Sequence, residues 1–293
     1  MHVRFHKTLF AAGLLIASSA VAGTIVYGNN ASFNGTETIE AFDLSTGAQV
    51  ANFIVPNAVA NRNGRGIAVV GTTIYYSNSD SGNVYKTNSV NHSDDGIAFT
   101  TNLSGIANIA FDGTALYVTG YNGTNNAYRY SLGGTLLQTV AGFGNSRDGF
   151  EVANNNLIAN RGDGEHVYDL YKLDGTLSIS AFIDVAAKVT NFAGITTGIT
   201  FDGTNYIISN PDGFSGPTTK LLIFDASGNY VRTQALAGSP AGAAGLRLLE
   251  DLSSLGNIPT NPPVTGTPEP VTFLLLGSGF AGIAMVRARS RKV

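Results

Sequence analysis

Short apolar segments and tight polar turns alternate along most of the chain. The clearest example is IAFDGTALYVTG, from Ile109 to Gly120, in which two runs rich in apolar and β-forming residues flank an Asp-Gly pair. This pattern predicts two strands joined by a tight turn. Nearly the same phrase returns as ITFDGTNYIISN, from Ile199 to Asn210. The middle of the protein is therefore predicted to repeat one unit of β-structure.

Each repeat extends to four expected strands. First strands are expected at 66–69, 109–111, 149–152 and 198–201, and second strands at 74–76, 116–118, 157–159 and 206–208. Third strands with their turns follow at 41–47, 128–134, 171–176 and 224–229, and outer strands at 136–140, 177–182 and 230–236. Ile25, Ile74, Leu116, Leu157 and Tyr206 are equivalent positions, so the repeats are 41 to 49 residues long. Four strands at this period are typical of a β-propeller blade.

The two ends of the repeat array complement each other. The first unit begins at its second strand, residues 24–27, whereas residues 245–249 resemble a first strand with no hairpin after it. Together they are expected to complete one blade, which would leave no free radial edge. We predict an all-β fold, a five-bladed β-propeller over residues 24–255, with six blades as the alternative. A β-sandwich explains the short strands but not this period. The blade phrase resembles that of NHL-type propellers, at the level of architecture.

Composition narrows the class of protein. The chain has 293 residues, 17 basic and 20 acidic, with 16 Phe, 12 Tyr and no Cys. Low charge with many aromatic residues favours an ordered protein. The lack of cysteine excludes disulfides, cysteine-ligated zinc and thiol catalysis. Because six of the basic residues lie near the two ends, the body has no basic stripe, and nucleic acid is excluded as a partner.

Residues 1–23 have the three parts of a secretory signal peptide. Arg4 and Lys7 precede an apolar run over residues 9–17, and Ala20-Val21-Ala22 provides a cleavage site of small residues. The run is too short to span a bilayer comfortably. We therefore expect an exported protein.

The C-terminal end combines three features in a fixed order. After a linker over residues 256–267, Pro268, Glu269 and Pro270 precede an uncharged apolar span, Val271 to Val286, which is expected to form a single transmembrane helix. A cationic tail follows, formed by Arg287, Arg289, Arg291 and Lys292. Such a tail is expected to stay on the cytoplasmic side.

Residues 267–293 thereby resemble the PEP-CTERM sorting signal of Gram-negative bacteria. The resemblance implies that an exosortase, a membrane protease, recognises Pro268, Glu269 and Pro270 while the helix halts transiently in the inner membrane. It also implies a location at the cell surface or outside the cell, in a bacterium that makes exopolysaccharide. A plain membrane anchor is the alternative interpretation.

Candidate ligand residues lie on one face of the predicted disc. The loops that enter first strands and those that join second to third strands share a face, where propellers usually meet ligands. The candidates for a polar rim there are Arg65, Asn78, Asp148, Arg161, Asp163 and Asn210, with Tyr121 and Phe214 as aromatic neighbours. Such side chains suit carbohydrate. For Asn78 and Asn210, which recur at one point of the repeat with Asn29 and Asn160, a structural role in the turns, where Asn tolerates a left-handed conformation, is favoured over a ligand role.

Signals for metal or catalysis are weak. Residues 78–83 alternate oxygen-bearing side chains as calcium loops do but lack the later bidentate acid, so no cofactor is expected and calcium is the alternative. No motif of a hydrolase or a phosphate loop is present. The favoured function is a non-enzymatic binding or interaction module, with exopolysaccharide or another surface protein as the partner. The alternative is a propeller hydrolase or lactonase-like enzyme with a metal at the channel mouth, which requires Asp148, Glu151, Arg161 and Asp163 to converge.

Overall fold

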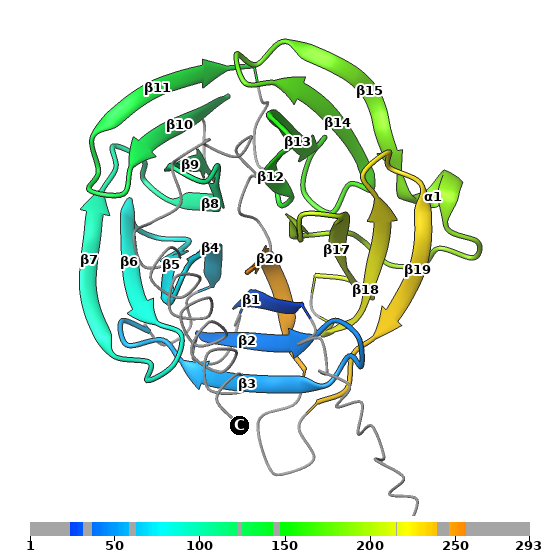
Figure 1. Ribbon diagram of the computed structural model, residues 1–293, viewed down its shortest axis with the longest axis horizontal. Helices are drawn as coiled ribbons and strands as arrows, with labels where there is room; N and C mark the ends of the chain where they lie inside the picture. Colours follow the sequence, from blue (N-terminus) through cyan, green and yellow to red (C-terminus); the bar gives the residue numbers. More distant parts are fainter. Residues whose placement is uncertain are drawn as a thin grey trace, which may run out of the picture.

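The structure is a computed structural model that describes residues 24–31, 37–58, 63–121, 125–142, 147–214, 216–238 and 246–255. These residues form five antiparallel sheets of four strands each, arranged around one axis (Figure 1). The predicted five-bladed β-propeller is confirmed, and the six-bladed alternative is wrong for the described part of the chain.

The strands of each blade run from the axis outward in a fixed order. Blade 1 consists of β20 (Leu248–Ser254), β1 (Ile25–Ala31), β2 (Thr38–Asp43) and β3 (Gln49–Ile54). Blade 2 consists of β4 (Gly64–Val70), β5 (Thr73–Asn78), β6 (Asn83–Asn88) and β7 (Asp94–Thr100). Blade 3 consists of β8 (Ile106–Phe111), β9 (Ala115–Gly120), β10 (Asn126–Ser131) and β11 (Leu136–Ala141).

Blades 4 and 5 repeat this arrangement. Blade 4 consists of β12 (Phe150–Ala153), β13 (Asn156–Asn160), β14 (Val167–Lys172) and β15 (Leu177–Asp184). Blade 5 consists of β16 (Ile199–Phe201), β17 (Asn205–Pro211), β18 (Thr218–Asp225) and β19 (Tyr230–Ala235). A single helical turn, α1 (Val185–Lys188), lies between them and is capped by the Asp184 carboxylate, which accepts from the Ala187 amide at 3.0 Å.

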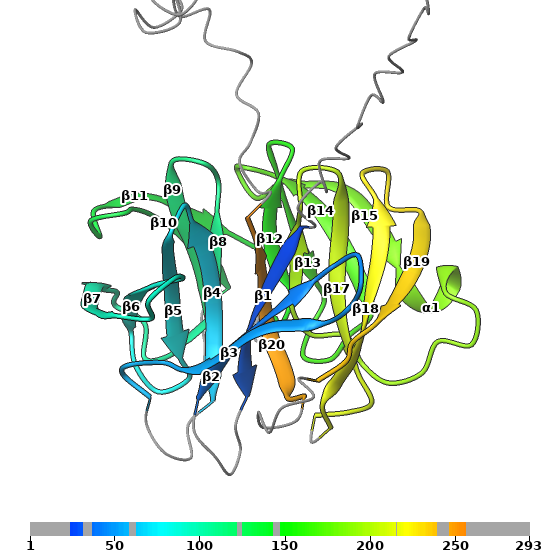
Figure 2. The same ribbon diagram turned by 60° about the horizontal axis from the view of Figure 1, so that its bottom comes forward.

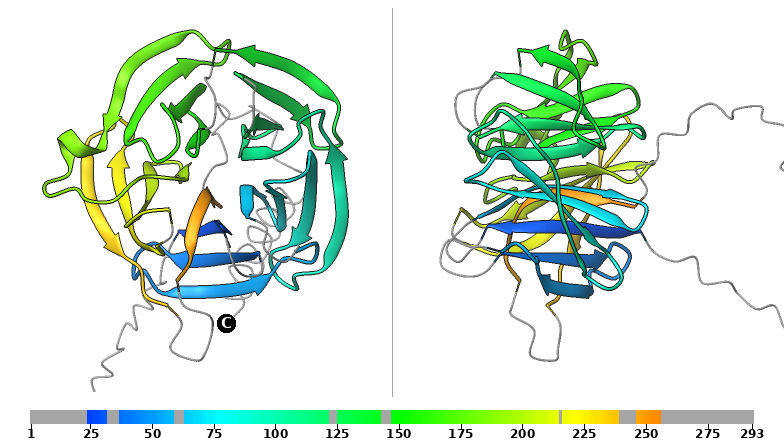
Figure 3. Two further views of the ribbon diagram at one scale, coloured as in Figure 1. Left: turned by 180° about the vertical axis from the view of Figure 1, so that it is seen from behind. Right: turned by 90° about the vertical axis from the view of Figure 1, so that its left-hand side faces the viewer.

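Blade 1 is closed by strands from both ends of the propeller, as predicted. β20 lies antiparallel to β1, with Asn29 opposite Asp251, and Figure 3 shows the pair side by side from behind the disc. The inner strand was expected at residues 245–249 but begins at Leu248. Leu249 and Leu252 explain the shift, because in this register both pack into the apolar layer between blades 5 and 1.

The core is divided into five apolar clusters, one at each interface between neighbouring blades. The two inner strands of the blades are buried on both faces, whereas outer strands such as β11 expose most of their side chains. This distribution agrees with the run of β-branched and aromatic residues at the expected first and second strands. Bulky rings such as Tyr76, Tyr117 and Phe42 are fully buried in these layers.

The repeated Asp-Gly pairs are turns. The Asp112 carboxylate accepts from the amides of Thr114 and Ala115 at 2.8 and 2.7 Å, and Gly113 has a φ of 92°. The corresponding Asp202 makes the same two contacts with the two amides that follow its Gly. Glycine adopts this backbone conformation without strain, so the recurrence reflects turn geometry. These turns lie on the opposite face of the disc from the loops that enter the inner strands (Figure 2).

The inner strands pair with only one neighbour in their own sheets, so their axial edges need other partners. Side chains of β20 supply several of these. Asp251 Oδ2 accepts from the amides of Ile67 and Ile109 at 3.0 and 3.2 Å, and the Ser253 hydroxyl accepts from Val69 at 2.9 Å. The C-terminal strand therefore ties blades 1, 2 and 3 together at the axis.

The two ends of the chain lie outside the described residues. This applies to the expected signal peptide, to Pro268, Glu269 and Pro270, to the span 271–286, and to Arg287, Arg289, Arg291 and Lys292. Within the described ranges, no helix has the length and apolar character needed to cross a membrane.

Replacement of Asp251 tests its role at the axis. Asp251→Ala leaves the amides of Ile67 and Ile109 without their acceptor, and each buried group left unpaired costs about 1–3 kcal/mol. We expect urea denaturation to show a loss of about 2–6 kcal/mol in the free energy of unfolding. The matched control Ser253→Ala removes the acceptor of Val69 alone and should cost about half as much. Equal losses in the two variants would contradict this account.

Candidate functional site

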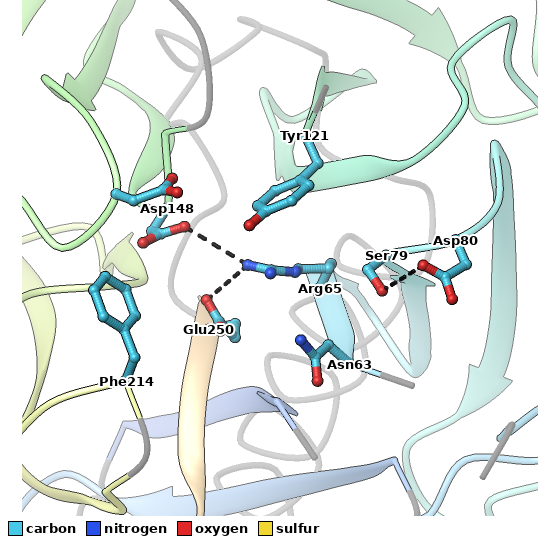
Figure 4. Close-up of a pocket in the computed structure, with 9 residues that line it drawn as sticks. Asn63, Arg65, Ser79, Asp80, Tyr121, Asp148, Phe214 and Glu250 are labelled. Carbon is cyan, nitrogen blue, oxygen red and sulfur yellow. Dashed lines mark hydrogen bonds and ion pairs between the residues drawn. The ribbon is translucent and has the colours of Figure 1, made fainter. Parts of the chain in front are cut away.

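A pocket of about 410 Å³ opens at the channel mouth, on the face that carries the loops between second and third strands. All five blades contribute to its walls (Figure 4). Three of the contributing segments are β4, β20 and the segment before β12, and the others are the β5–β6, β9–β10, β13–β14 and β17–β18 loops. The lining residues are Asn63, Arg65, Ser79, Asp80, Tyr121, Asp148, Asp163, Phe214 and Glu250.

Arg65 lies at the centre of this pocket. Its Nη1 is 2.9 Å from Glu250 Oε2 and 3.6 Å from Asp148 Oδ1, so one guanidinium serves two carboxyl groups. Its Cζ lies 4.3 Å from the centroid of the Tyr121 ring, a cation–π distance. Only 7% of the Arg65 side chain is exposed, and Nε has no hydrogen-bond partner among the described residues. The arginine thus retains one buried donor.

Asp148, Asp163 and Glu250 hold their protons more tightly than free acids do. Burial, together with the negative charges of Glu250 and Asp163, raises the pKa of Asp148 to about 8 despite the nearby Arg65. Burial also raises the pKa of Glu250 and that of Asp163, and Arg65 opposes both shifts. Asp148 Oδ2 accepts from the Gly164 amide at 3.0 Å, which fixes the carboxyl against the β13–β14 loop.

Aromatic rings lie on two sides of these carboxyl groups. Figure 4 shows the Tyr121 ring on one side of Asp148 and the Phe214 ring on another. The Phe214 side chain contacts the backbone at Gly164, where a Cβ atom would lie 2.7 Å from its Cζ. Phe214 is nevertheless 43% exposed, so one part of an apolar ring faces solvent at the rim. Such a surface can cover the apolar face of a ligand.

The sequence-derived rim residues separate into two groups. Arg65, Asp148 and Asp163 line the pocket, together with Tyr121 and Phe214. Arg161 points elsewhere. It forms a bidentate contact with Asp169 at 2.8 and 3.0 Å and donates to the Ser180 hydroxyl.

The other two rim candidates, Asn78 and Asn210, are buried and hold loop backbone. Asn210 Nδ2 donates to the carbonyls of Ala193 and Ile195 at 3.1 and 2.8 Å, while Asn78 Oδ1 accepts from the Asp80 amide. The structural interpretation of the recurring asparagines therefore fits both positions. Neither of the two has a positive φ, so their role is hydrogen bonding rather than a left-handed turn.

Glu250 is a pocket residue that the sequence alone did not indicate. Because the closing strand was expected at residues 245–249, this glutamate fell one residue beyond it. The pattern of the strand gave no signal for it, because a bulge in the pairing of β20 with β1 leaves Glu250 without a partner residue and lets both Leu249 and Leu252 pack in the core.

The geometry expected of the metal-dependent enzyme is not seen. Glu151 lies away from the pocket and accepts from the amides of Val152 and Phe201 at 2.7 and 3.3 Å, and Arg161 is held by Asp169. The required four side chains therefore do not converge. Among the residues that the structure describes, no group of three or more His, Asp or Glu side chains is placed to hold a metal ion.

A separate buried acid, Glu37, lies between blades 1 and 2. Its Oε1 accepts from Asn29 Nδ2 at 3.4 Å, and its Oε2 has no partner among the described residues. Burial is the main cause that raises the pKa of Glu37 to about 8. Glu40 of β2 is also buried, and its pKa is raised to about 7, mainly by burial.

Comparisons with known proteins give no family. No family model matches the chain, and no curated protein matches it. A chain in the crystal structure of a nidogen/laminin complex is 13% identical with a TM-score of 0.48, covering 79% of this chain and 97% of that chain. A protein of unknown function from Bacteroides caccae is 11% identical with a TM-score of 0.47, covering 79% and 98%. Neither likeness assigns a ligand or a partner.

The buried acids predict a fall in stability with rising pH. A carboxyl group whose pKa is higher in the folded than in the unfolded protein binds more protons when folded, so stability is lost as pH rises from about 4 towards 8. Glu37, Glu40 and Asp148 all have this sign. We expect a melting temperature several degrees lower at pH 8.5 than at pH 5. Each kcal/mol corresponds to about 2–4 °C at this size.

Glu37→Gln should reduce that difference, because the amide has no proton to lose. The control Glu165→Gln changes an exposed side chain and should leave the difference as it is. A melting temperature that rises between pH 5 and pH 8.5, or a Glu37→Gln variant with an unchanged pH profile, would contradict the assignment.

Proposed function

We propose that this chain is an exported binding protein of the bacterial surface or extracellular matrix, and that its channel-mouth pocket binds saccharide. The observation that carries the proposal is the combination of aromatic and polar groups in one open pocket. Tyr121 and Phe214 offer ring faces, while Asn63, Ser79 and the acids offer hydrogen-bonding groups of both kinds. Sugars present hydroxyl groups at their edges and C–H groups on their faces, which matches this lining.

The proposal includes the route by which the protein reaches the surface. The resemblance of residues 267–293 to a PEP-CTERM signal supports sorting by an exosortase in the inner membrane. The same resemblance makes exopolysaccharide of the producing cell the first polymer to test. A binding role is favoured over hydrolysis because the side chains required by the metal-dependent alternative are engaged elsewhere.

Loss of the exposed aromatic ring should weaken saccharide binding. Phe214→Ala removes a ring face that is 43% exposed at the pocket, and we expect affinity for a bound polysaccharide to fall about 3- to 10-fold. A glycan array of neutral, acidic and amino-sugar polymers identifies the ligand, and titration calorimetry measures the change. Tyr230→Ala, an aromatic of 36% exposure on β19, is the control. Failure of the original protein to bind any polymer would overturn the proposal.

The sorting signal can be tested in the producing cell. Replacement of Pro268, Glu269 and Pro270 by alanine should leave the full-length protein in the inner membrane, because the protease loses its recognition residues. Replacement of Pro262 and Pro263 in the linker is the matched control and should leave release unchanged. Fractionation and immunoblotting report both outcomes, and normal release of the first variant would refute sorting by this signal.

A further inference from the structure

We infer that the pocket selects saccharides that carry a free ammonium group, that is, amino-sugar units without an N-acetyl group. This inference rests on the proposed saccharide site and specifies its ligand. It depends on the balance of charge in the lining, on the polar side chains beside the acids and on the position of the exposed ring.

The pocket has more acidic than basic groups. Arg65 is the one basic side chain among the nine lining residues, whereas Asp80, Asp148, Asp163 and Glu250 are acidic. The Arg65 guanidinium contacts both Glu250 and Asp148. No ion pair joins Asp163 to a basic side chain within the described part of the chain, although Arg65 acts on it through space. A second cation in this pocket would be stabilised by these groups.

Asp148 and Asp163 mark the place where that cation would bind. Both side chains line the pocket, and the negative charge of Asp163 is one cause that raises the pKa of Asp148, so the two carboxyl groups share a proton rather than ionise together. An ammonium group has three donors and a positive charge, so it can replace the shared proton and bond to both carboxylates. Binding should therefore release a proton from the protein.

The remaining features fit the rest of a sugar ring. Asn63 and Ser79, which also line the pocket, can donate to a hydroxyl or ring oxygen of the ligand. The Phe214 ring at the rim can cover the C–H face of the same or the adjacent unit. Uronic acids and phosphorylated sugars would bring a negative charge towards the four acidic side chains of the lining, which disfavours them. The expected order of affinity is amino sugar, then neutral sugar, then acidic sugar.

The test compares two oligosaccharides that differ only in acetylation. Full-length protein in detergent is titrated at pH 6 with a hexasaccharide of glucosamine and with the corresponding hexasaccharide of N-acetylglucosamine. We expect the free amine to bind at least about tenfold more tightly. We also expect proton release with the amine only, measured as a dependence of the binding enthalpy on the buffer.

Asp163→Asn removes the negative charge of this side chain and keeps its size, so it tests whether charge selects the ligand. This variant should bind the glucosamine oligomer about tenfold more weakly and the acetylated oligomer almost unchanged. Asp95→Asn, the same change at an exposed residue of β7, is the control, and melting temperatures establish that both variants are folded. Equal affinity for the two oligomers, or an effect of Asp163→Asn on both alike, would overturn the inference and leave saccharide binding intact. Absence of binding to any saccharide would overturn the proposed function itself.

Discussion

Five inner strands surround a narrow axis, and their backbone groups on that side need hydrogen-bond partners without a neighbouring strand to supply them. Asp251 meets this constraint most directly, because a single carboxylate accepts from the inner strands of blades 2 and 3. For these hydrogen bonds to form, the inner strands of neighbouring blades must also approach one another closely. A Cβ atom at Gly66 would lie 2.6 Å from the Ile109 amide nitrogen, and one at Gly198 would lie 2.6 Å from Asp251 Cα. Glycine at the start of these strands therefore permits the packing on which the closed ring depends.

The acids near the axis fall into two classes that differ in their partners. Asp251 and Glu151 accept from backbone amides inside the ring, so they belong to the framework. Asp148, Asp163 and Glu250 lie at the mouth, around a guanidinium that serves two of them. The hydrogen-bond partners of an acid therefore decide its role. An acid that accepts from backbone amides stabilises the strands, whereas an acid at the mouth of the pocket is able to bind a ligand. It also explains why Glu151, expected with the others, has no part in the pocket.

Much of the architecture could be predicted because a blade repeats its own local chemistry. The period of 41 to 49 residues, the Asp-Gly turns and the complementary half-units at Ile25 and Leu248 are all visible in the sequence. The site was only partly predictable. The face of the disc follows from topology, which placed Arg65, Asp148 and Asp163 together. The hydrogen-bond partner of each side chain does not follow from topology. For this reason neither the contact of Arg161 with Asp169 nor the burial of Asn210 could be deduced from the sequence. Glu250 was missed because a shift of the closing strand changes which side chains reach the axis.

Glu250 makes the site dependent on closure of the ring. It comes from the last strand, whereas Arg65 begins blade 2 and Asp148 begins blade 4, so the pocket is complete only when the C-terminal strand is in place. β20 runs from the pocket mouth to the opposite face, where the described chain reaches Leu255 (Figure 2). Thr24, at the start of β1, lies on that same opposite face. If the proposed sorting signal continues from Leu255, it approaches the inner membrane from the face away from the pocket, so the pocket would point away from that membrane until the signal is processed.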